Sequence, residues 1–469
     1  MNSEAGNKQR PFRVAIVGSG PSGFYAAEPL LTASLNVEVD MYDRLPTPFG
    51  LVRYGVAPDH PKIKNVIKVY EKTAADPKFA FFGNVAVGRD ISVGELRRFY
   101  DAVIFACGAE TDRHLNIPNE NFKGSHTATE FVGWYNGHPD YQGRSFDLSH
   151  PVAVVIGLGN VAMDVARVLC KTVDELKNTD ITRHALEVLA ESNVREVHVV
   201  GRRGPAQADF TPVEIREFGE LHDCDPVLDP AELNLNPASQ AELDDPQAPV
   251  RRKNFEILQK YAAWPSSAKR KKFVLHFLKS PVGIKGGGRV EKLVLEKNEL
   301  TGEPGRQNAR GTGQFEELDC GLIFRSVGYQ GLPIDDLPFD AKKGVFPNQG
   351  GRLTRDVETV PGLYATGWIK RGPSGVIGTN KPDSQETVTN LLADLPKLTP
   401  CEQPVRADVM EFLSRKEIRF IRFEDWKKID AAEIKRGEPL GKPREKFIRV
   451  AEMMACLDTR EAGHVKREA

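Results

Sequence analysis

Cysteine is scarce and scattered in this chain, which excludes several kinds of chemistry. The 469 residues contain six cysteines, and none is close to another in sequence. Their spacing lacks a C-x-x-C redox pair, a zinc or iron–sulfur ligand run and a disulfide framework. We therefore expect no metal site and six ordinary thiols. The cysteines are Cys107, Cys170, Cys224, Cys320, Cys401 and Cys456.

Long apolar runs and an excess of one charge are also missing. No segment is apolar over the length needed to span a bilayer, and the first ten residues lack the hydrophobic stretch of a secretion signal. A formal net charge of −1 gives no bulk attraction to nucleic acid or to an anionic membrane. The sequence predicts a cytoplasmic protein without nucleic-acid binding or membrane insertion, whose charged partners dock on a local patch.

A glycine-rich turn lies almost at the start of the chain. The β-branched run Phe12–Val17 predicts a buried strand, and Gly18, Gly20 and Gly23 follow it before a helical pattern. Such glycines let the backbone approach a pyrophosphate at the helix N-terminus. A second predicted strand, Val37–Asp43, ends in an acid about twenty residues later, where a ribose-binding carboxylate belongs. The pattern predicts a dinucleotide site; the alternative is a tight turn without a ligand.

A second strand, glycine turn and helix begin near residue 151. Gly157, Gly159 and Ala162 form Gly-x-Gly-x-x-Ala, and the next predicted strand ends at Arg202 and Arg203 instead of an acid. An acid there binds a ribose 2′-hydroxyl, whereas two forked guanidinium groups suit a 2′-phosphate. This site is predicted to bind NADP(H); the alternative is a solvated arginine pair at a strand end.

Glycine, proline and polar residues predict four irregular segments. Leu45–Lys64 is expected to be an ordered loop that wraps a ligand. Residues 225–250 are expected to be a surface excursion, and Thr301–Gln314 a polar loop. The glycine-rich stretch 367–378 precedes a helix predicted from about Ser384, so its backbone N–H groups could face the pyrimidine end of a flavin.

Two dinucleotide turns in one chain predict two cofactors that meet. The arginines assign NADP(H) to the second turn, which leaves FAD for the first. Hydride transfer from nicotinamide to flavin is the chemistry that this pair supports. Because the chain lacks a redox-active cysteine pair and an iron–sulfur ligand run, we expect the electrons to leave the flavin for an external acceptor.

Four segments resemble one family closely. PFGLVRYGVAPDHPKIK, GLGNVAMDVAR, VGRRGPAQADFTPVEIRE and GWIKRGPSGVIGTNKPDSQETV are similar to segments of the adrenodoxin reductase-like ferredoxin–NADP reductases. The likeness runs from about Phe12 to the C-terminal helices. It implies a monomeric α/β flavoprotein with two Rossmann-like three-layer dinucleotide-binding domains, the NADP domain being inserted into the FAD domain. The implied boundaries are 11–111 and 331–469 for FAD, and 112–330 for NADP(H).

The resemblance also implies which residues contact each cofactor. Two positions depart from the usual family pattern: Asp43 replaces the commoner Glu, and Leu158 stands where Asn or Gln is frequent, which leaves only a backbone contact there. With the glycines of the first turn, the FAD residues are Gly18, Gly20, Gly23, Asp43, Leu51, Val87, Trp368, Gly375, Val376 and Ile377. The NADP(H) residues are Arg113, Leu158, Gly159, Asn160, Val161, Arg202, Arg203, Glu214 and Gly375.

His60 and Glu217 are the polar pair that the family places near the flavin. Hydride transfer needs no general base, so we assign this catalytic pair to proton management and orientation. The alternatives are that His60 is a loop histidine that hydrogen-bonds to nearby backbone groups, and that Glu217 is a helical carboxylate exposed to solvent.

The function implied is an NADPH-dependent ferredoxin reductase that passes single electrons from FAD to an acidic ferredoxin, for example one serving a cytochrome P450 or iron metabolism. Two other functions stay open: the electron-input subunit of a glutamate synthase-type system, and a non-catalytic NADP-sensing flavoprotein. An acidic partner requires cationic residues around the cleft. The candidates are Arg216, Arg251, Arg252, Lys253 and Lys269–Lys272.

Overall fold

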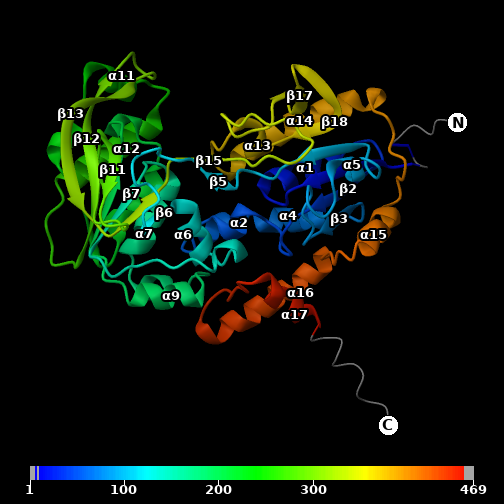
Figure 1. Cartoon of the computed structure of the whole chain (residues 1–469), viewed down its shortest axis with the longest axis horizontal. Coiled ribbons are helices and arrows are strands. Elements are labelled where there is room, and N and C mark those ends of the chain that lie inside the picture. Colours follow the sequence, from blue (N-terminus) through cyan, green and yellow to red (C-terminus); the bar gives the residue numbers. More distant parts are fainter. Residues whose placement is uncertain (1–5, 8–9, 459–469) are drawn as a thin grey trace, which may run out of the picture.

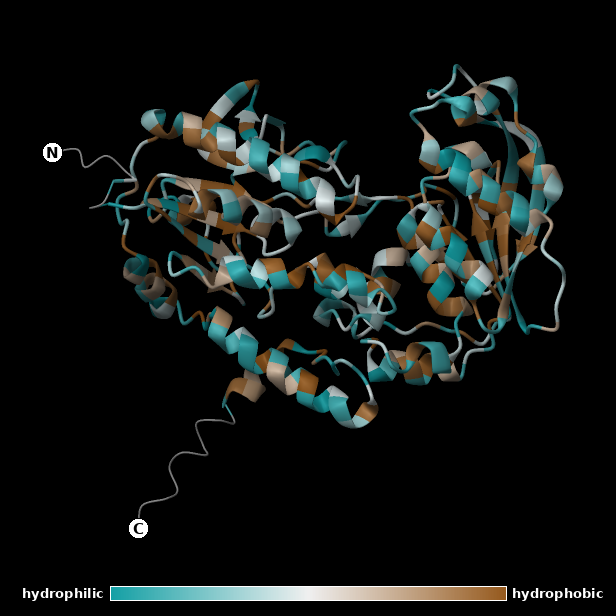
Figure 2. Ribbon diagram, turned by 180° about the vertical axis from the view of Figure 1, so that it is seen from behind, coloured by the Kyte–Doolittle hydropathy of each residue, from teal (hydrophilic) through white to brown (hydrophobic). Residues whose placement is uncertain are grey.

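The computed structural model describes residues 6–7 and 10–458, and it shows two lobes joined near β5 (Thr111–Asp112) and β15 (Tyr329–Gln330) (Figure 1). One lobe is built on a seven-stranded sheet and the other on a six-stranded sheet. In Figure 2 the strands of both sheets are largely hydrophobic, whereas many helices also present hydrophilic residues. This is the layered pattern expected when helices cover a buried parallel sheet.

Strands from both ends of the chain form the seven-stranded sheet. Its order is β16 (Asn348–Gln349), β17 (Arg352–Arg355), β18 (Glu358–Ala365), β4 (Ala102–Phe105), β1 (Phe12–Val17), β2 (Val37–Tyr42) and β3 (Phe79–Phe82). From β18 to β3 the strands are parallel, and Leu363 of β18 is paired with Val103 of β4. The second sheet is therefore inserted within the first, which confirms the predicted topology.

The six-stranded sheet is parallel throughout and lies wholly inside the insertion. Its order is β6 (Ser125–Thr127), β14 (Leu322–Arg325), β7 (Val152–Ile156), β8 (Glu196–Val200), β10 (Lys271–His276) and β9 (Cys224–Leu228). An antiparallel sheet of β11 (Lys279–Lys285), β12 (Lys292–Thr301) and β13 (Asn308–Asp319) adjoins it.

The helices follow the strands in the order typical of such folds. In the first lobe and its early loops they are α1 (Pro21–Leu31), α2 (Leu51–Tyr54), α3 (Pro61–Lys64), α4 (Ile67–Ala74) and α5 (Val93–Leu96). In the insertion they are α6 (Ala128–Tyr135), α7 (Asn160–Cys170), α8 (Val173–Leu176), α9 (Arg183–Ala190), α10 (Pro212–Arg216), α11 (Pro237–Asp244) and α12 (Pro249–Ala262). After it come α13 (Trp368–Arg371), α14 (Asn380–Asp394), α15 (Arg406–Arg415), α16 (Phe423–Gly437) and α17 (Val450–Asp458).

Two segments expected to be irregular are regular structure, and those predictions were wrong. Residues 225–250 contain most of edge strand β9, all of α11 and the start of α12. Thr301–Gln314 contains the turn and the first half of β13, whose side chains are mostly exposed. Both segments are polar because one or both of their faces meet water, so hydrophobic periodicity does not reveal them. The predicted loop Leu45–Lys64 holds two short helices, α2 and α3.

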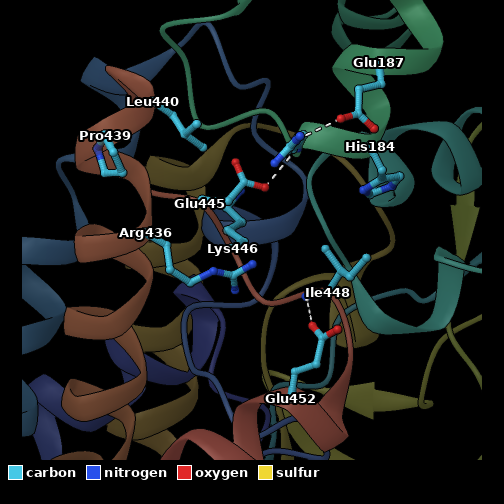
Figure 3. A pocket seen from close by; sticks show the side chains of 10 residues that line it. His184, Glu187, Arg436, Pro439, Leu440, Glu445, Lys446, Ile448 and Glu452 are labelled. Carbon is cyan, nitrogen blue, oxygen red and sulfur yellow. Dashed lines mark hydrogen bonds and ion pairs between the residues drawn. The ribbon is translucent and has the colours of Figure 1, made fainter.

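The C-terminal helices pack on the first lobe and then reach the second. Phe423 and Trp426 of α16 are buried in the core that also holds α1 and β1. Beyond α16, Lys446 forms a buried ion pair with Asp180 of the inserted lobe at 3.1 Å, and Glu445 accepts a hydrogen bond from the backbone N–H of Arg183 at 3.0 Å. Figure 3 shows the hollow of about 530 Å³ that this segment and α9 enclose.

Candidate active site between two nucleotide folds

The two glycine turns occupy corresponding places in the two sheets. Gly18 has φ +110°, and a Cβ there would lie 2.4 Å from the carbonyl oxygen of Ala106, just beyond β4. Gly157 has φ +136°, and its Cβ would lie 2.2 Å from the carbonyl oxygen of Ser326, just beyond β14. Each turn thus lies where its sheet's connections diverge to opposite sides, the place where nucleotides bind in such sheets.

The helices that follow these turns have open N-termini. Gly20 and Gly159 are the N-cap residues of α1 and α7, and no side chain caps either helix among the described residues. A Cβ at either glycine would meet nothing within 4 Å, whereas one at Gly23 would lie 2.2 Å from the carbonyl oxygen of Gly18. Free N–H groups, open space and the helix dipole therefore fit a pyrophosphate at both sites.

Asp43 lies directly after β2, at the carboxyl end of the sheet. Its Oδ2 accepts hydrogen bonds from Ser19 N at 3.1 Å and Ser19 Oγ at 2.5 Å, and its Oδ1 accepts one from Leu45 N at 2.9 Å. Burial raises the pKa of Asp43 despite these bonds. The predicted ribose acid is therefore beside the first glycine turn, held by a serine that the glycine fingerprint alone did not single out.

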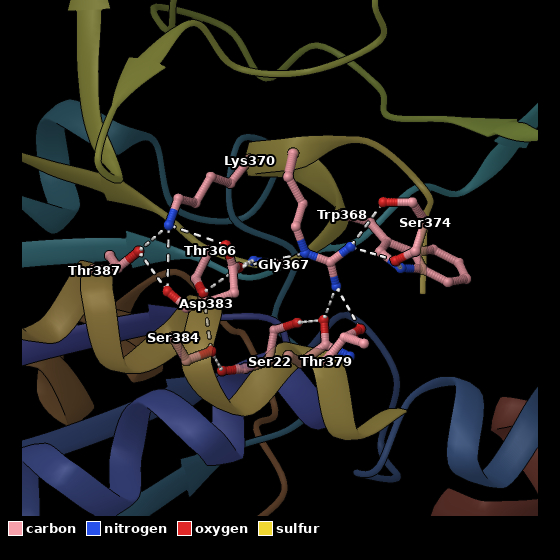
Figure 4. Close-up of polar contacts among 12 residues, drawn as sticks. Ser22, Thr366, Gly367, Trp368, Lys370, Ser374, Thr379, Asp383, Ser384 and Thr387 are labelled. Carbon is pink, nitrogen blue, oxygen red and sulfur yellow. Dashed lines mark hydrogen bonds and ion pairs between the residues drawn. The ribbon is translucent and has the colours of Figure 1, made fainter. Parts of the chain in front are cut away.

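The glycine-rich stretch after β18 is held against α1 by a polar network (Figure 4). Asp383 Oδ2 accepts a hydrogen bond from Gly367 N at 2.5 Å. Ser22 of α1 contacts Asn380 at 3.0 Å, and Ser384 Oγ donates to the carbonyl of Ser22 at 3.0 Å. A Cβ at Gly367 would lie 2.0 Å from the Ser22 hydroxyl oxygen, so glycine is required there. Segments separated by more than 350 residues thus meet at the first nucleotide turn.

Arg371 braces the loop that follows α13. Its guanidinium donates to the carbonyl of Ser374, to Thr379 Oγ1 at 3.3 Å and to Asn380 Oδ1 at 2.8 Å (Figure 4). The enclosed loop contains Gly375, which has φ +80°. These contacts hold the loop in one shape without a ligand, and no sequence pattern predicted this role for Arg371.

The remaining predicted FAD residues present apolar or aromatic surface. Leu51 and Val376 are 44% and 57% exposed, unusually high for large apolar side chains, so both have surface free for a ligand. Trp368 stacks on Tyr329 with ring centroids 5.4 Å apart, and Tyr329 was not predicted. Val87 is half-buried in a bridge with Ile91 beyond β3. Ile377 is half-buried against the core of the first lobe.

His60 and Glu217 meet across the junction of the lobes. His60 precedes α3 in the first lobe, Glu217 follows α10 in the inserted lobe, and His60 Nε2 lies 3.1 Å from both carboxylate oxygens. Burial opposes the charge on His60, but the hydrogen bond to Glu217 raises its pKa overall. The pKa of Glu217 is lowered: burial raises it, and the hydrogen bond to His60 and the charge of Arg167 outweigh that effect.

Arg167 of α7 is the centre of a cluster that the sequence analysis missed. Its fully buried guanidinium lies 2.8 Å from Asp59, 2.6 Å from Asp164, 3.0 Å from Glu214 and 3.1 Å from Glu217. The signal that could have revealed it is the pair of opposite charges, three residues apart, in the otherwise apolar helix GLGNVAMDVAR. Because a buried charge requires partners, such a pair predicts an ion network.

The cluster also engages the carboxylate of Glu214, whose contact with NADP(H) stays a prediction. Its carboxylate accepts from Arg167 instead of being open to solvent, and burial together with the nearby charge of Asp164 raises its pKa to about 7. Ligand atoms of Asp59, His60 and Glu217 lie within 4.8 Å of one another. Asp59 is paired with both Arg167 and Lys171, and Glu217 with Arg167 and His60, so these groups form an ion network within the chain.

The predicted NADP(H) residues gather around the second turn. Asn160 Oδ1 accepts a hydrogen bond from Thr211 N at 2.8 Å, and the carbonyl of Leu158 accepts one from Asp209 N at 3.0 Å. Arg202 is exposed, and Arg203 forms an ion pair with Asp209 at 2.7 Å. Val161 is half-buried in the first turn of α7.

Arg113 lies at the other end of the insertion, next to β5. Its guanidinium donates to the carbonyl of Tyr329 at 3.3 Å and to that of Lys343 at 3.1 Å. The chain itself therefore engages this side chain, and its contact with NADP(H) stays a prediction.

Across the described ranges, every helix is too short or too polar to cross a bilayer.

Comparisons with known proteins agree with this geometry. The family described as pyridine nucleotide-disulphide oxidoreductase matches residues 12–217. The chain is 48% identical over 458 residues to NADPH-ferredoxin reductase FprA of Mycobacterium tuberculosis, covering 95% of this chain and 99% of that protein. It is 44% identical over 459 residues to mitochondrial NADPH:adrenodoxin oxidoreductase of Homo sapiens, covering 95% and 92%.

Solved structures show the same likeness. The structure of Mycobacterium tuberculosis FprA in complex with NADPH matches with a TM-score of 0.90 and 47% identity, covering 96% of this chain and 100% of that one. The atomic-resolution FprA structure that revealed a covalent modification of NADP+ also gives 0.90, at 48% identity, over 95% and 99%. With two glycine turns, an arginine pair after β8 and this identity over nearly its whole length, the chain belongs to the adrenodoxin reductase-like ferredoxin–NADP reductases.

Proposed function

We propose that this protein is an NADPH-dependent ferredoxin reductase with FAD on the first turn and NADP(H) on the second. The observation that carries the proposal is the pair of open helix N-termini at the two sheets' switch points, with His60 and Glu217 in contact across the junction. When bound, FAD supplies the chemistry of taking a hydride from NADPH and giving single electrons to an iron–sulfur ferredoxin.

The residues of the chain bind and orient the cofactors. Arg202 and Arg203 would hold the 2′-phosphate, since forked guanidinium groups match phosphate oxygens. The brace formed by Arg371 and the Asp383–Gly367 contact would fix the loop beside the flavin. His60 would hold a proton on Nε2 that Glu217 accepts at 3.1 Å, and this hydrogen bond raises the pKa of the imidazole.

The partner we propose is an acidic ferredoxin that docks on the inserted lobe. Of the predicted docking residues, Arg216, Arg252 and Lys253 are exposed, and none forms an ion pair within the described ranges. Arg251 is paired with Glu242, and Lys271 donates to backbone carbonyls, so both are less available. Three unpaired cations on α10 and α12 would attract a negatively charged surface.

We further propose a monomer whose domain boundaries lie at 11–111, 112–330 and 331–469. The antiparallel pairing of β5 with β15, which joins residues 111–112 to 329–330, supports these limits because the chain crosses between lobes there. Residence in the cytoplasm stays a prediction from the sequence.

Steady-state reduction of cytochrome c by NADPH, with and without added ferredoxin, tests the function. We expect ferredoxin to stimulate the rate and rising salt to reduce the stimulation. Charge reversal at Arg252 and Lys253 should raise the KM for ferredoxin and leave the KM for NADPH unchanged. Activity that ferredoxin does not stimulate at any salt concentration would favour the electron-input subunit, and binding without turnover would favour the NADP sensor.

A further inference from the structure

One of the two arginines predicted to bind the 2′-phosphate already forms an ion pair with a carboxylate. Asp209 Oδ2 accepts a hydrogen bond from Arg203 Nη2 at 2.7 Å, and the two side chains are 66% and 37% exposed. Arg202, the other predicted phosphate ligand, is exposed and makes no ion pair within the ranges that the structure describes. The two arginines are therefore unequal before any nucleotide binds.

The backbone fixes Asp209 next to the nucleotide turn. Its N–H donates to the carbonyl of Leu158 at 3.0 Å, and Leu158 belongs to the second glycine turn. Its neighbours Ala208 and Phe210 are 7% and 1% exposed, so both sides of the residue are anchored in the core. These contacts fix the backbone of Asp209, so its carboxylate stays beside the nucleotide turn in any rotamer.

We propose that Asp209 is a specificity-tuning residue that weakens the preference of this site for a 2′-phosphate. The inference rests on the proposed NADP(H) function. A phosphate dianion must share the donors of Arg203 with the carboxylate or displace it, and in either case it stays near a fixed negative charge. A nucleotide without the 2′-phosphate neither competes with the carboxylate for Arg203 nor brings a second negative charge close to it. Arg202 thus supplies most of the attraction for the 2′-phosphate. Asp209 lowers the affinity of the site, so that oxidised NADP is released more readily.

Asp209→Asn tests the proposal because it removes the charge and keeps the size. We expect the Kd for NADPH and for 2′,5′-ADP to fall about three- to tenfold, the range expected for one solvent-exposed charge near a dianion. The Kd for NADH and for 5′-AMP should not change. The matched control is Glu303→Gln: Glu303 is exposed and precedes Pro304 and Gly305, which line the same hollow of about 540 Å³ as Asp209. This control should alter none of the four constants.

Each other outcome has a distinct meaning. A higher Kd for NADPH in Asp209→Asn would mean that the carboxylate positions Arg203 for binding, and an unchanged Kd would mean that it does not matter; either result overturns the proposal. Asp209→Ala must shift the Kd in the same direction, which guards against a local effect of the amide. If the unaltered protein itself failed to bind NADPH more tightly than NADH, the proposed NADP(H) function would be lost instead.

Discussion

Replacing Arg167 by methionine should strongly destabilise the protein. The guanidinium is fully buried and lies within 3.1 Å of four carboxylates, two of which are almost wholly buried. Methionine fills most of the volume but leaves those acids without their shared cation. Breaking a buried ion pair by removing one partner costs about 3–5 kcal/mol, because the remaining charge is uncompensated. We expect a loss of about that size in the free energy of unfolding at pH 8.

The loss of stability caused by Arg167→Met should increase as pH rises. Burial raises the pKa of Asp164 and of Glu214 even with Arg167 present, and loss of the guanidinium should raise both further above their values in the unfolded chain. The protonated forms are then compatible with folding at low pH, and stability is lost as pH rises through the raised values. The difference in the free energy of unfolding between Arg167→Met and the unaltered protein should therefore increase from pH 5.5 to pH 8.5.

Urea unfolding followed by circular dichroism at several pH values measures this effect. Arg183→Met is a matched control, because Arg183 is 69% exposed and pairs with Glu187 on the surface. Its loss should be at most about 1 kcal/mol at every pH, as for exposed ion pairs. A loss below about 1 kcal/mol in Arg167→Met, or a difference that narrows as pH rises, would refute the reasoning.

Three further predictions concern the nucleotide site and the junction. Replacing Arg202 and Arg203 together by alanine should raise the KM for NADPH at least about tenfold more than that for NADH, because charge-assisted hydrogen bonds to the phosphate are lost; equal increases would contradict the 2′-phosphate role. Burial raises the pKa of Glu214 to about 7, so its contribution to stability is lost as pH rises from its unfolded-chain value to about 7. Glu214→Gln should therefore flatten the pH dependence of urea unfolding between about pH 5 and 7; an unchanged slope would contradict the raised pKa. Asp180→Asn leaves the buried Lys446 and the half-buried Lys64 without their shared carboxylate and should lower the free energy of unfolding, measured with urea, by about 3–5 kcal/mol. Asp174→Asn, at an exposed pair, should cause no measurable loss; equal losses in both variants would contradict a stabilising role for the ion pairs of Asp180.

Features set by neighbouring residues were predictable from the sequence. The predicted strand Phe12–Val17 has the bounds of β1. The two glycine turns lie where the fingerprints put them, because each depends on φ angles and close approaches within a short segment. The contact of His60 with Glu217 was also anticipated, but only through the family resemblance.

Features that depend on distant contacts were not predictable. The cluster around Arg167 joins Asp59 and Glu217, which lie 108 residues before it and 50 residues after it in the printed sequence. The brace of Arg371 depends on the path of a loop, which composition does not fix. β13 escaped detection because a mostly exposed strand is held by its pairing with β12 and not by an apolar face.

The pairing of β18 with β4 also sets the order in which a ribosome can finish the two lobes. β4 emerges early, yet its neighbour is complete only at residue 365, whereas all strands of the six-stranded sheet lie between residues 125 and 325. During translation the inserted lobe has all its strands while the first lobe still exposes the unpaired edge of β4. The nascent chain therefore carries a complete inserted sheet beside an incomplete one, whose β4 edge is open to non-native strand pairing until β18 is made.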